Sequence, residues 1–370
     1  MRKLLLGCLL LSAFTLKAQV YSNKVVGKKN EAQIDSLKKT DYPYALPIWG
    51  DKATKGGYNL PYSAGVSVQY FGQVSDLIIE NLQVGFNNGI KYNLDEIVRF
   101  DEARAKASAV TARPDIWLFP FLNVYGIFGV ASASTQVGFG IWAPDASNTP
   151  QEILHANTKI EFTSTTMGFG MTPTIGVGGG FLALDMNMAF TDVPQLNKPA
   201  RTFVFGPRFG KNFKLKKPDT NFAIWVGGFR VKLSSGTDGS IAMSEVLPAG
   251  FGGKVDQGLI KVADSQQKVD TWWAGLTPTE QKNPANIAKH NTANSALEKA
   301  GGILSSAQSA INTVENSTVQ HSMDKRPKDM WNFIVGTQYQ FNKHFMVRAE
   351  AGFLSSRTQI ITGFQYRFGL

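Results

Sequence analysis

Apolar and polar side chains alternate with a period of two over several stretches of the chain, most clearly across residues 181–191. There every even-numbered residue from Leu182 to Phe190 is apolar, and the odd-numbered ones from Ala183 to Thr191, among them Asp185 and Asn187, are polar or small. Such alternation is typical of a β-strand with one apolar face. It recurs towards the C-terminus, so the chain is predicted to consist mainly of strands.

The length and ends of these stretches favour a membrane barrel over a soluble sheet, which would also alternate. The segments run for about ten residues, enough for a tilted strand to cross a bilayer, and aromatic residues gather near their ends. In lipid every backbone group must be paired, so such strands must close into a barrel. We therefore predict an all-β fold, a closed antiparallel transmembrane β-barrel of about twelve strands at 62–72, 76–86, 100–111, 115–130, 134–143, 158–171, 175–191, 200–214, 220–234, 331–341, 344–354 and 358–369.

The N-terminus has the pattern of a secretory signal peptide over residues 1–18. Arg2 and Lys3 precede an apolar stretch, and Ala18 suits a cleavage site. Cleavage would remove Cys8, the single cysteine of the chain. The mature protein is then predicted to contain neither a disulfide nor a thiolate metal site.

One long segment between the predicted strands has a helical period instead. Leu297, Ala300 and Leu304 follow a heptad-like spacing, and Thr277 with Glu280 forms a capping box. We expect two or more helices packed on each other, outside the cell or as a plug in the lumen. The predicted boundaries are 19–60 for a lysine-rich periplasmic arm, 61–234 and 331–370 for the barrel, and 235–330 for the helical insertion.

The last residues carry a resemblance to a known class. Phe364, Tyr366 and Phe368 alternate up to the terminal Leu370, and this ending resembles the C-terminal strand of Gram-negative outer-membrane β-barrels, a porin-like class. It departs from that class in ending on Leu370 and not on an aromatic residue. The resemblance implies an outer-membrane location, contact with outer-membrane lipids and recognition by the barrel-assembly machinery. It implies no substrate.

The polar faces of the predicted strands supply candidates for the lumen lining. Rings of Arg and Lys would favour anions in a water-filled path. A packed, salt-bridged interior that only holds the barrel together is the alternative, and the sequence does not separate the two. The candidates are Asp185, Asn187, Arg208, Arg230, Lys232, Arg348, Glu350, Gln365 and Arg367.

Three functions follow from this picture. The favoured one is a passive channel or transporter for small, possibly anionic, solutes. The alternative is a non-conducting scaffold whose insertion 235–330 binds a partner protein. A barrel hydrolase is the third, with His155 and His321 as the candidates, although residues close in sequence do not make a catalytic geometry.

Other classes of function find little support. The histidines are isolated, so no metal site or cofactor is expected. The chain has 38 Lys+Arg against 28 Asp+Glu, but this basic excess is dispersed and does not indicate nucleic-acid binding. We expect the protein not to be an enzyme.

Overall fold

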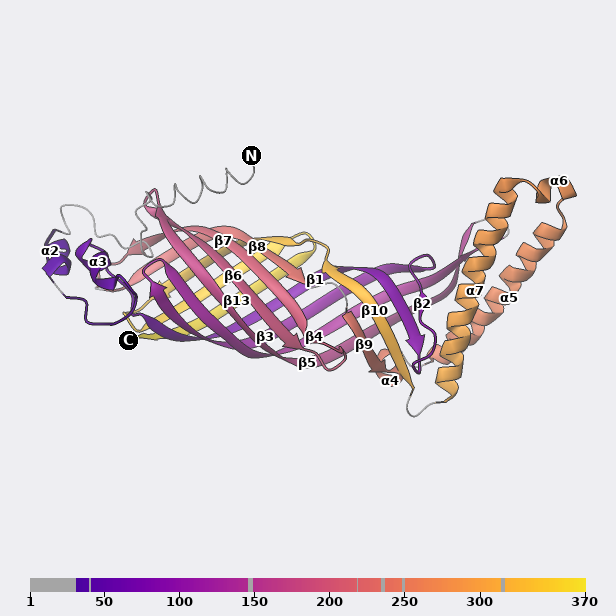
Figure 1. Cartoon of the computed structure of the whole chain (residues 1–370), viewed down its shortest axis with the longest axis horizontal. Coiled ribbons are helices and arrows are strands. Elements are labelled where there is room, and N and C mark those ends of the chain that lie inside the picture. Colours follow the sequence, from indigo (N-terminus) through magenta and orange to yellow (C-terminus); the bar gives the residue numbers. More distant parts are fainter. Residues whose placement is uncertain are drawn as a thin grey trace.

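The computed structural model describes residues 31–39, 41–145, 149–217, 219–233, 237–247, 250–313 and 317–370; the predicted signal peptide lies outside them. Ten strands close into an antiparallel barrel in which the last strand pairs with the first (Figure 1). They are β1 (Ala64–Phe86), β3 (Val98–Phe119), β4 (Leu122–Pro144), β5 (Pro150–Val177), β6 (Gly180–Asp192), β7 (Ala200–Lys214), β8 (Asn221–Leu233), β11 (Trp331–Gln340), β12 (Phe345–Leu354) and β13 (Arg357–Phe368).

The predicted class is therefore right and the predicted number of strands is wrong. The segments 62–72 and 76–86 belong to the single strand β1. The segments 100–111, 115–130 and 134–143 make only two strands, β3 and β4, because the apolar run around Pro120 contains a turn. β1, β3 and β4 contain 22 or 23 residues each, so segments of membrane length divide them wrongly. β5, with 28 residues, extends beyond both ends of the predicted strand 158–171.

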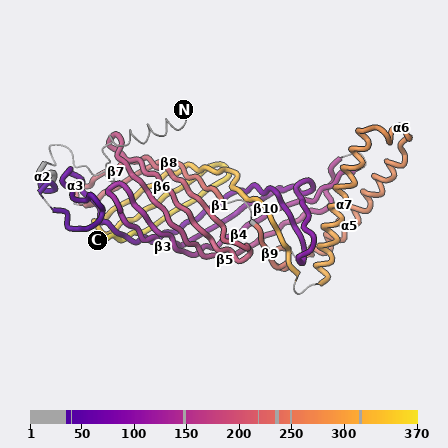
Figure 2. The backbone as a smooth tube through the Cα atoms, in the orientation of Figure 1, coloured from indigo at the N-terminus to yellow at the C-terminus, as the bar shows by residue number. Residues whose placement is uncertain are grey.

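We call the end of the barrel at which the described chain starts and finishes the terminal end. The chain makes tight turns there. Gly178 and Gly179 join β5 to β6 with φ of 54° and 80°, a left-handed backbone that glycine adopts without a steric penalty. β11 and β12 are joined by residues 341–344. The long connections lie at the opposite, far end, which also has the short turn between β12 and β13 (Figure 2).

Beyond the closed ring, part of the sheet continues into a second structure at the far end, which we call the headpiece. The outer half of β1 pairs with β10 (Thr318–Pro327) and with β2 (Tyr92–Asn93), and β10 pairs with β9 (Thr237–Ala242). These strands lie outside the barrel ring. The insertion at 235–330 thus includes two strands, where only helices had been predicted.

The helices of the insertion complete the headpiece. They are α4 (Met243–Val246), α5 (Phe251–Ala274), α6 (Pro278–Gln281) and α7 (Pro284–Asn312). α5 and α7 form the hairpin that projects at the far end in Figure 1. The Thr277–Glu280 capping box is present at the start of α6. None of the helices among the described residues has both the length and the apolar character that a membrane crossing requires.

The helical hairpin is packed on the strands and is not a detached loop. Leu297 and Leu304 of α7 and Val255 of α5 are buried in one cluster with Ile97 and with Leu154 of β5. Burial of this apolar area stabilises the headpiece by the hydrophobic effect. The headpiece therefore shares continuous strands with the barrel wall and has an apolar core of its own.

The outer surface of the barrel carries an apolar belt. Outward positions hold large apolar side chains, such as Phe169, which is 62% exposed, together with Val68, Phe209 and Phe353. Towards the far end the outward positions of β3 and β5 become charged, at Arg104, Lys106, Lys159 and Glu161. The belt thus covers only the part of the strands nearer the terminal end.

An N-terminal arm, with α2 (Glu31–Lys39) and α3 (Gly50–Lys55), lies against the terminal end of the barrel (Figure 1). The Leu46 N–H donates to the Leu370 carbonyl at 3.1 Å, and the Ile48 N–H donates to the Leu118 carbonyl at 3.0 Å. The arm is therefore hydrogen-bonded to the barrel rim.

Candidate functional site: the barrel interior

Glu350, on β12, is the centre of the barrel interior. Its carboxylate accepts two hydrogen bonds from Arg208, from Nε at 2.7 Å and from Nη2 at 3.1 Å. Trp225 Nε1 donates to it at 2.8 Å, and Arg348 Nη2 at 3.2 Å. Glu350 is 2% exposed and Arg208 is 5% exposed. The pair is a buried, bidentate Arg–carboxylate contact, the geometry in which such pairs are strongest.

Asp185 extends this network across the lumen. Its Oδ2 accepts from Arg208 Nη1 at 3.2 Å, its Oδ1 accepts from Thr172 Oγ1 at 3.1 Å, and the Tyr125 hydroxyl donates to it as well. The Arg113 guanidinium lies 4.0 Å from the centre of the Tyr125 ring. Charge and hydrogen-bond donors are thus matched across β4, β5, β6, β7 and β12.

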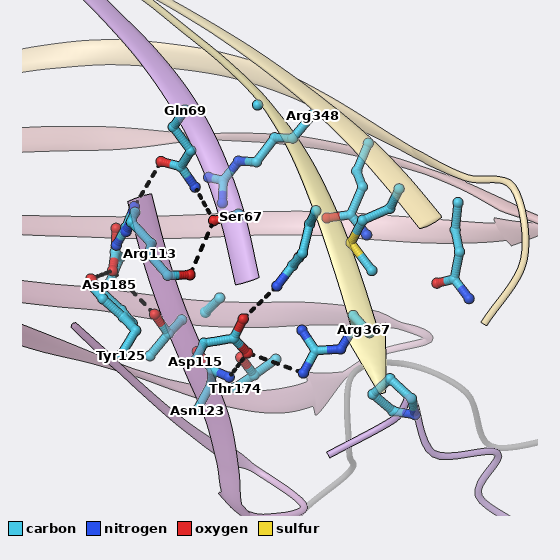
Figure 3. A pocket seen from close by; sticks show the side chains of 18 of the residues that line it. Ser67, Gln69, Arg113, Asp115, Asn123, Tyr125, Thr174, Asp185, Arg348 and Arg367 are labelled. Atoms are coloured by element: carbon cyan, nitrogen blue, oxygen red, sulfur yellow. Dashed lines mark hydrogen bonds and ion pairs between the residues drawn. The ribbon is translucent and has the colours of Figure 1, made fainter. Parts of the chain in front are cut away.

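Asp115 anchors a second group nearer the terminal end, seen in Figure 3. It accepts from Gln365 Nε2 at 2.5 Å and from Asn123 Nδ2 at 2.7 Å, and Arg367 Nη2 lies 3.0 Å from its Oδ2. Arg367 also donates to the Tyr62 carbonyl, two residues before β1, at 3.0 Å. The segment that joins the arm to β1 is therefore bonded directly to the polar interior.

Between these groups lies a cavity of about 160 Å³. Arg113, Asp115, Asp185, Arg348 and Arg367 line it (Figure 3). Asp115 and Asp185 on its walls are paired with Arg367 and Arg208, and Arg348 is paired with Glu350. The space could hold a few waters or a small polar solute.

Seven of the nine predicted lumen residues face this interior. Asp185, Arg208, Arg348, Glu350, Gln365 and Arg367 belong to the network just described, and Asn187 is on the same face of β6 as Asp185.

Arg230 and Lys232 face outward, contrary to the prediction. Arg230 lies opposite Phe205 and Trp331 in the sheet, and Lys232 lies opposite Phe203; Trp331 is 45% exposed. The two faces of β8 were assigned the wrong way round because both are apolar in its first half. Trp225 faces the lumen, since its indole N–H donates to Glu350.

Sequence reasoning missed several interior residues. Tyr125, Arg113 and Asp115 lie in strands whose limits were predicted wrongly, so their faces could not be assigned. One signal was available in the sequence: alternate residues counted back from the turn at Pro120 put Arg113 and Asp115 on the same face of the strand. Trp225 was missed because an aromatic residue was taken as facing lipid.

The two histidines considered for catalysis lie in different surroundings. His155 Nδ1 is 3.1 Å from Glu152 Oε1, and its Nε2 is 3.7 Å from Asp101 Oδ2. His321 is on β10, and strand alternation puts its neighbours Ser322 and Asp324 on the opposite face. In the part of the chain that the structure describes, no group of three or more His, Cys, Asp or Glu could hold a metal ion.

Comparison with known proteins gives matches in structure only. No protein-family model and no curated protein matches the sequence. An outer membrane channel from Pseudomonas putida F1 aligns with 83% of this chain and 96% of its own, at 9% identity and a TM-score of 0.26. The beta domain of the Bordetella autotransporter BrkA aligns with 83% and 100%, at 8% identity and a TM-score of 0.28. The transport unit of the Escherichia coli autotransporter AIDA-I aligns with 83% and 90%, at 7% identity and a TM-score of 0.26.

Proposed function

We propose that the protein is an outer-membrane β-barrel whose lumen is closed by its own side chains and which holds the headpiece outside the cell as a rigid surface for a partner protein. In this proposal the barrel is a scaffold and not an enzyme. The main support is the burial of the interior charges. Arg208 and Glu350 are 5% and 2% exposed, whereas side chains that line an aqueous pore are solvated.

Three features support the location in the membrane. The ring of strands is closed, as lipid requires of a spanning sheet. Its outward face carries the apolar belt. The connections at the end with the arm and the C-terminus are all short, whereas the long ones are at the far end, and in outer-membrane barrels the short turns are periplasmic. The headpiece would then lie on the extracellular side.

Conductance in a planar bilayer tests whether the lumen is closed. The mature protein, with folding verified by heat-modifiable gel mobility, should show no discrete current steps. The variant R208S/E350S removes the central pair and should admit small ions once it passes the same gel test. Discrete steps in the wild-type protein would contradict a closed lumen.

Site-specific labelling tests the orientation. Cleavage of the predicted signal peptide leaves no cysteine in the mature chain, so one can be introduced without background. A285C, at the exposed start of α7, should react with a membrane-impermeant maleimide on intact cells. K216C, in the exposed turn between β7 and β8 at the terminal end, should react only after the outer membrane is permeabilised. The reverse pattern would invert the orientation.

A narrow passage for small anionic solutes is the second candidate. The cavity of about 160 Å³ favours it, since four arginines and two aspartates line that space. If wild-type protein does conduct, R348E should shift its selectivity towards cations. The matched control is R230E, which changes the same residue type on the outward face and should leave selectivity unchanged.

A further inference from the structure

A second set of polar side chains lies in the interior, on the far side of the Glu350 network. Arg357 and Gln359 begin β13, and Asn332 is on β11. The three side chains are among the most buried polar groups of the barrel, with exposures of 1%, 5% and 2%. They belong to neither the Glu350 nor the Asp115 group.

Arg357 has only neutral partners. Its Nε and Nη2 donate to Gln73 Oε1 at 3.2 Å and 2.8 Å, and Nη2 also donates to Gln359 Oε1 at 3.3 Å. The guanidinium lies 5.3 Å from the centre of the Phe229 ring. Among the described residues no carboxylate forms an ion pair with it, and its Nη1 has no hydrogen-bond partner.

The two amides beside Arg357 also have unused donors. Gln359 Nε2 and Asn332 Nδ2 are buried without a partner, as is Asn332 Oδ1. Both side chains lie over Gly352 of β12: a Cβ placed there would be 2.6 Å from Gln359 Cγ and 2.7 Å from Asn332 Nδ2. The glycine therefore leaves the space in which the amides of β11 and β13 approach each other.

The arrangement has one positive charge and an excess of donors. A buried guanidinium without a negative partner is costly, and so is each unpaired buried N–H group. The other arginines at this depth meet that cost with carboxylates: Arg208 with Glu350 and Asp185, and Arg367 with Asp115. An acceptor with negative charge next to Arg357 would satisfy these groups.

We propose that this place is a binding site for a small monovalent inorganic anion of the chloride class, held by Arg357 Nη1 and by the amide N–H groups of Gln359 and Asn332. A single negative charge matches the single guanidinium. The near-complete burial of all three side chains favours an ion of halide size over a larger carboxylate or phosphate. The site does not depend on the proposed function, because it fits a closed barrel and a narrow passage equally well.

Thermal unfolding tests the site, since an anion that binds only the folded state raises the midpoint with concentration until the site saturates. The midpoint would be read from heat-modifiable gel mobility of the full mature chain, in sodium chloride and in sodium gluconate of equal ionic strength. The wild type should be more stable in chloride, with a saturating dependence. R357Q should show the same midpoint in both salts.

The matched control is R326Q, which removes an exposed arginine paired with Glu80 and should keep the chloride dependence. The proposal is overturned if the wild type unfolds at the same temperature in both salts, or if R357Q responds to chloride as the wild type does.

A second measurement needs no variant and covers the case in which R357Q does not fold. Crystals of the wild-type protein grown in sodium bromide should show an anomalous-scattering peak within hydrogen-bonding distance of Arg357 Nη1. Ordered density there without anomalous signal would identify a water molecule and overturn the proposal. If the barrel shows no current in the bilayer but binds bromide, the anion site is supported independently of the conductance result.

Discussion

At the scale of single residues, Glu350 holds the interior of the barrel together. Arg208, Arg348 and Trp225, from three different strands, all donate to its carboxylate. Loss of the Glu350 charge would leave buried cationic groups without a negative partner. Removal of one partner of a buried ion pair is strongly destabilising.

E350Q should therefore lower the free energy of unfolding by about 3–5 kcal/mol. The midpoint of heat-modifiable gel mobility measures this. The control is E80Q, which breaks the exposed pair with Arg326 and should cost about 0–1 kcal/mol. Equal effects of the two substitutions would argue against a tightly coupled interior.

His321, in the headpiece, gives a prediction in pH. Burial, and then the positive charge of Lys325, lower its pKa from 6.5 to about 4, while Asp238 acts in the opposite sense and Lys91 in the same sense. Because the folded pKa lies below the unfolded one, the unfolded state binds the extra proton between these values. Stability is complete above about pH 6.5 and is lost as the pH falls towards 4.

The expected loss for the wild type is on the order of 2–3 kcal/mol across that window. Limited proteolysis of the headpiece at several pH values would show it. H321Q should flatten the dependence, whereas H290Q, which changes another headpiece histidine, should retain it. Identical pH profiles for H321Q and the wild type would assign the acid sensitivity to other groups.

The residue scale also shows how far sequence reasoning could go. On β12 and β13 only one face is apolar, so alternation assigned Arg348, Glu350, Gln365 and Arg367 to the interior. On β8 it failed, because the choice between two apolar faces depends on the contact between Trp225 and Glu350, residues 125 positions apart. Alternation contains no information about such partners.

At the scale of elements, the unusual feature is the length of β1, β3, β4 and β5. Only part of each strand carries the apolar belt, and the remainder supports the headpiece. The sequence shows a change of outward residues from apolar to charged, but no turn signal accompanies it. A division into membrane-length pieces therefore gave twelve strands for ten. The pairing of β10 with β1 could not be predicted, since more than 230 residues separate the partners.

The helical hairpin should be a separate unit of stability within this arrangement. Leu297 of α7 is 1% exposed in the headpiece core, so L297A should destabilise the headpiece by about 2–5 kcal/mol. Proteolytic cleavage in α5 to α7 should accelerate, while the gel mobility of the barrel remains unchanged. The control I260A removes a side chain that is 62% exposed on α5 and should have little effect.

At the scale of the whole molecule, two regions share the strands but have different interiors. The barrel is filled by charge pairs and hydrogen bonds, and the headpiece is filled by apolar side chains. This difference implies that the barrel can close without the helices, whereas the outer strands cannot remain covered without them.

Replacement of residues 251–313 by a short Gly–Ser linker should leave the barrel's heat-modifiable mobility intact. It should also expose Leu82, Ile97 and Leu154, which the helices cover, and so increase the binding of a hydrophobic dye. A barrel that no longer folds would instead show that the helices take part in closing the ring.

The long strands also have a mechanical consequence. β5 contains 28 residues, and at about 3.3 Å per residue and a tilt of about 40° it rises about 70 Å, against about 25 Å for an apolar band. The helical hairpin is thus carried well clear of the bilayer on a ladder of backbone hydrogen bonds. A pull on the hairpin would load the strands in shear and reach the barrel wall without first stretching a slack linker.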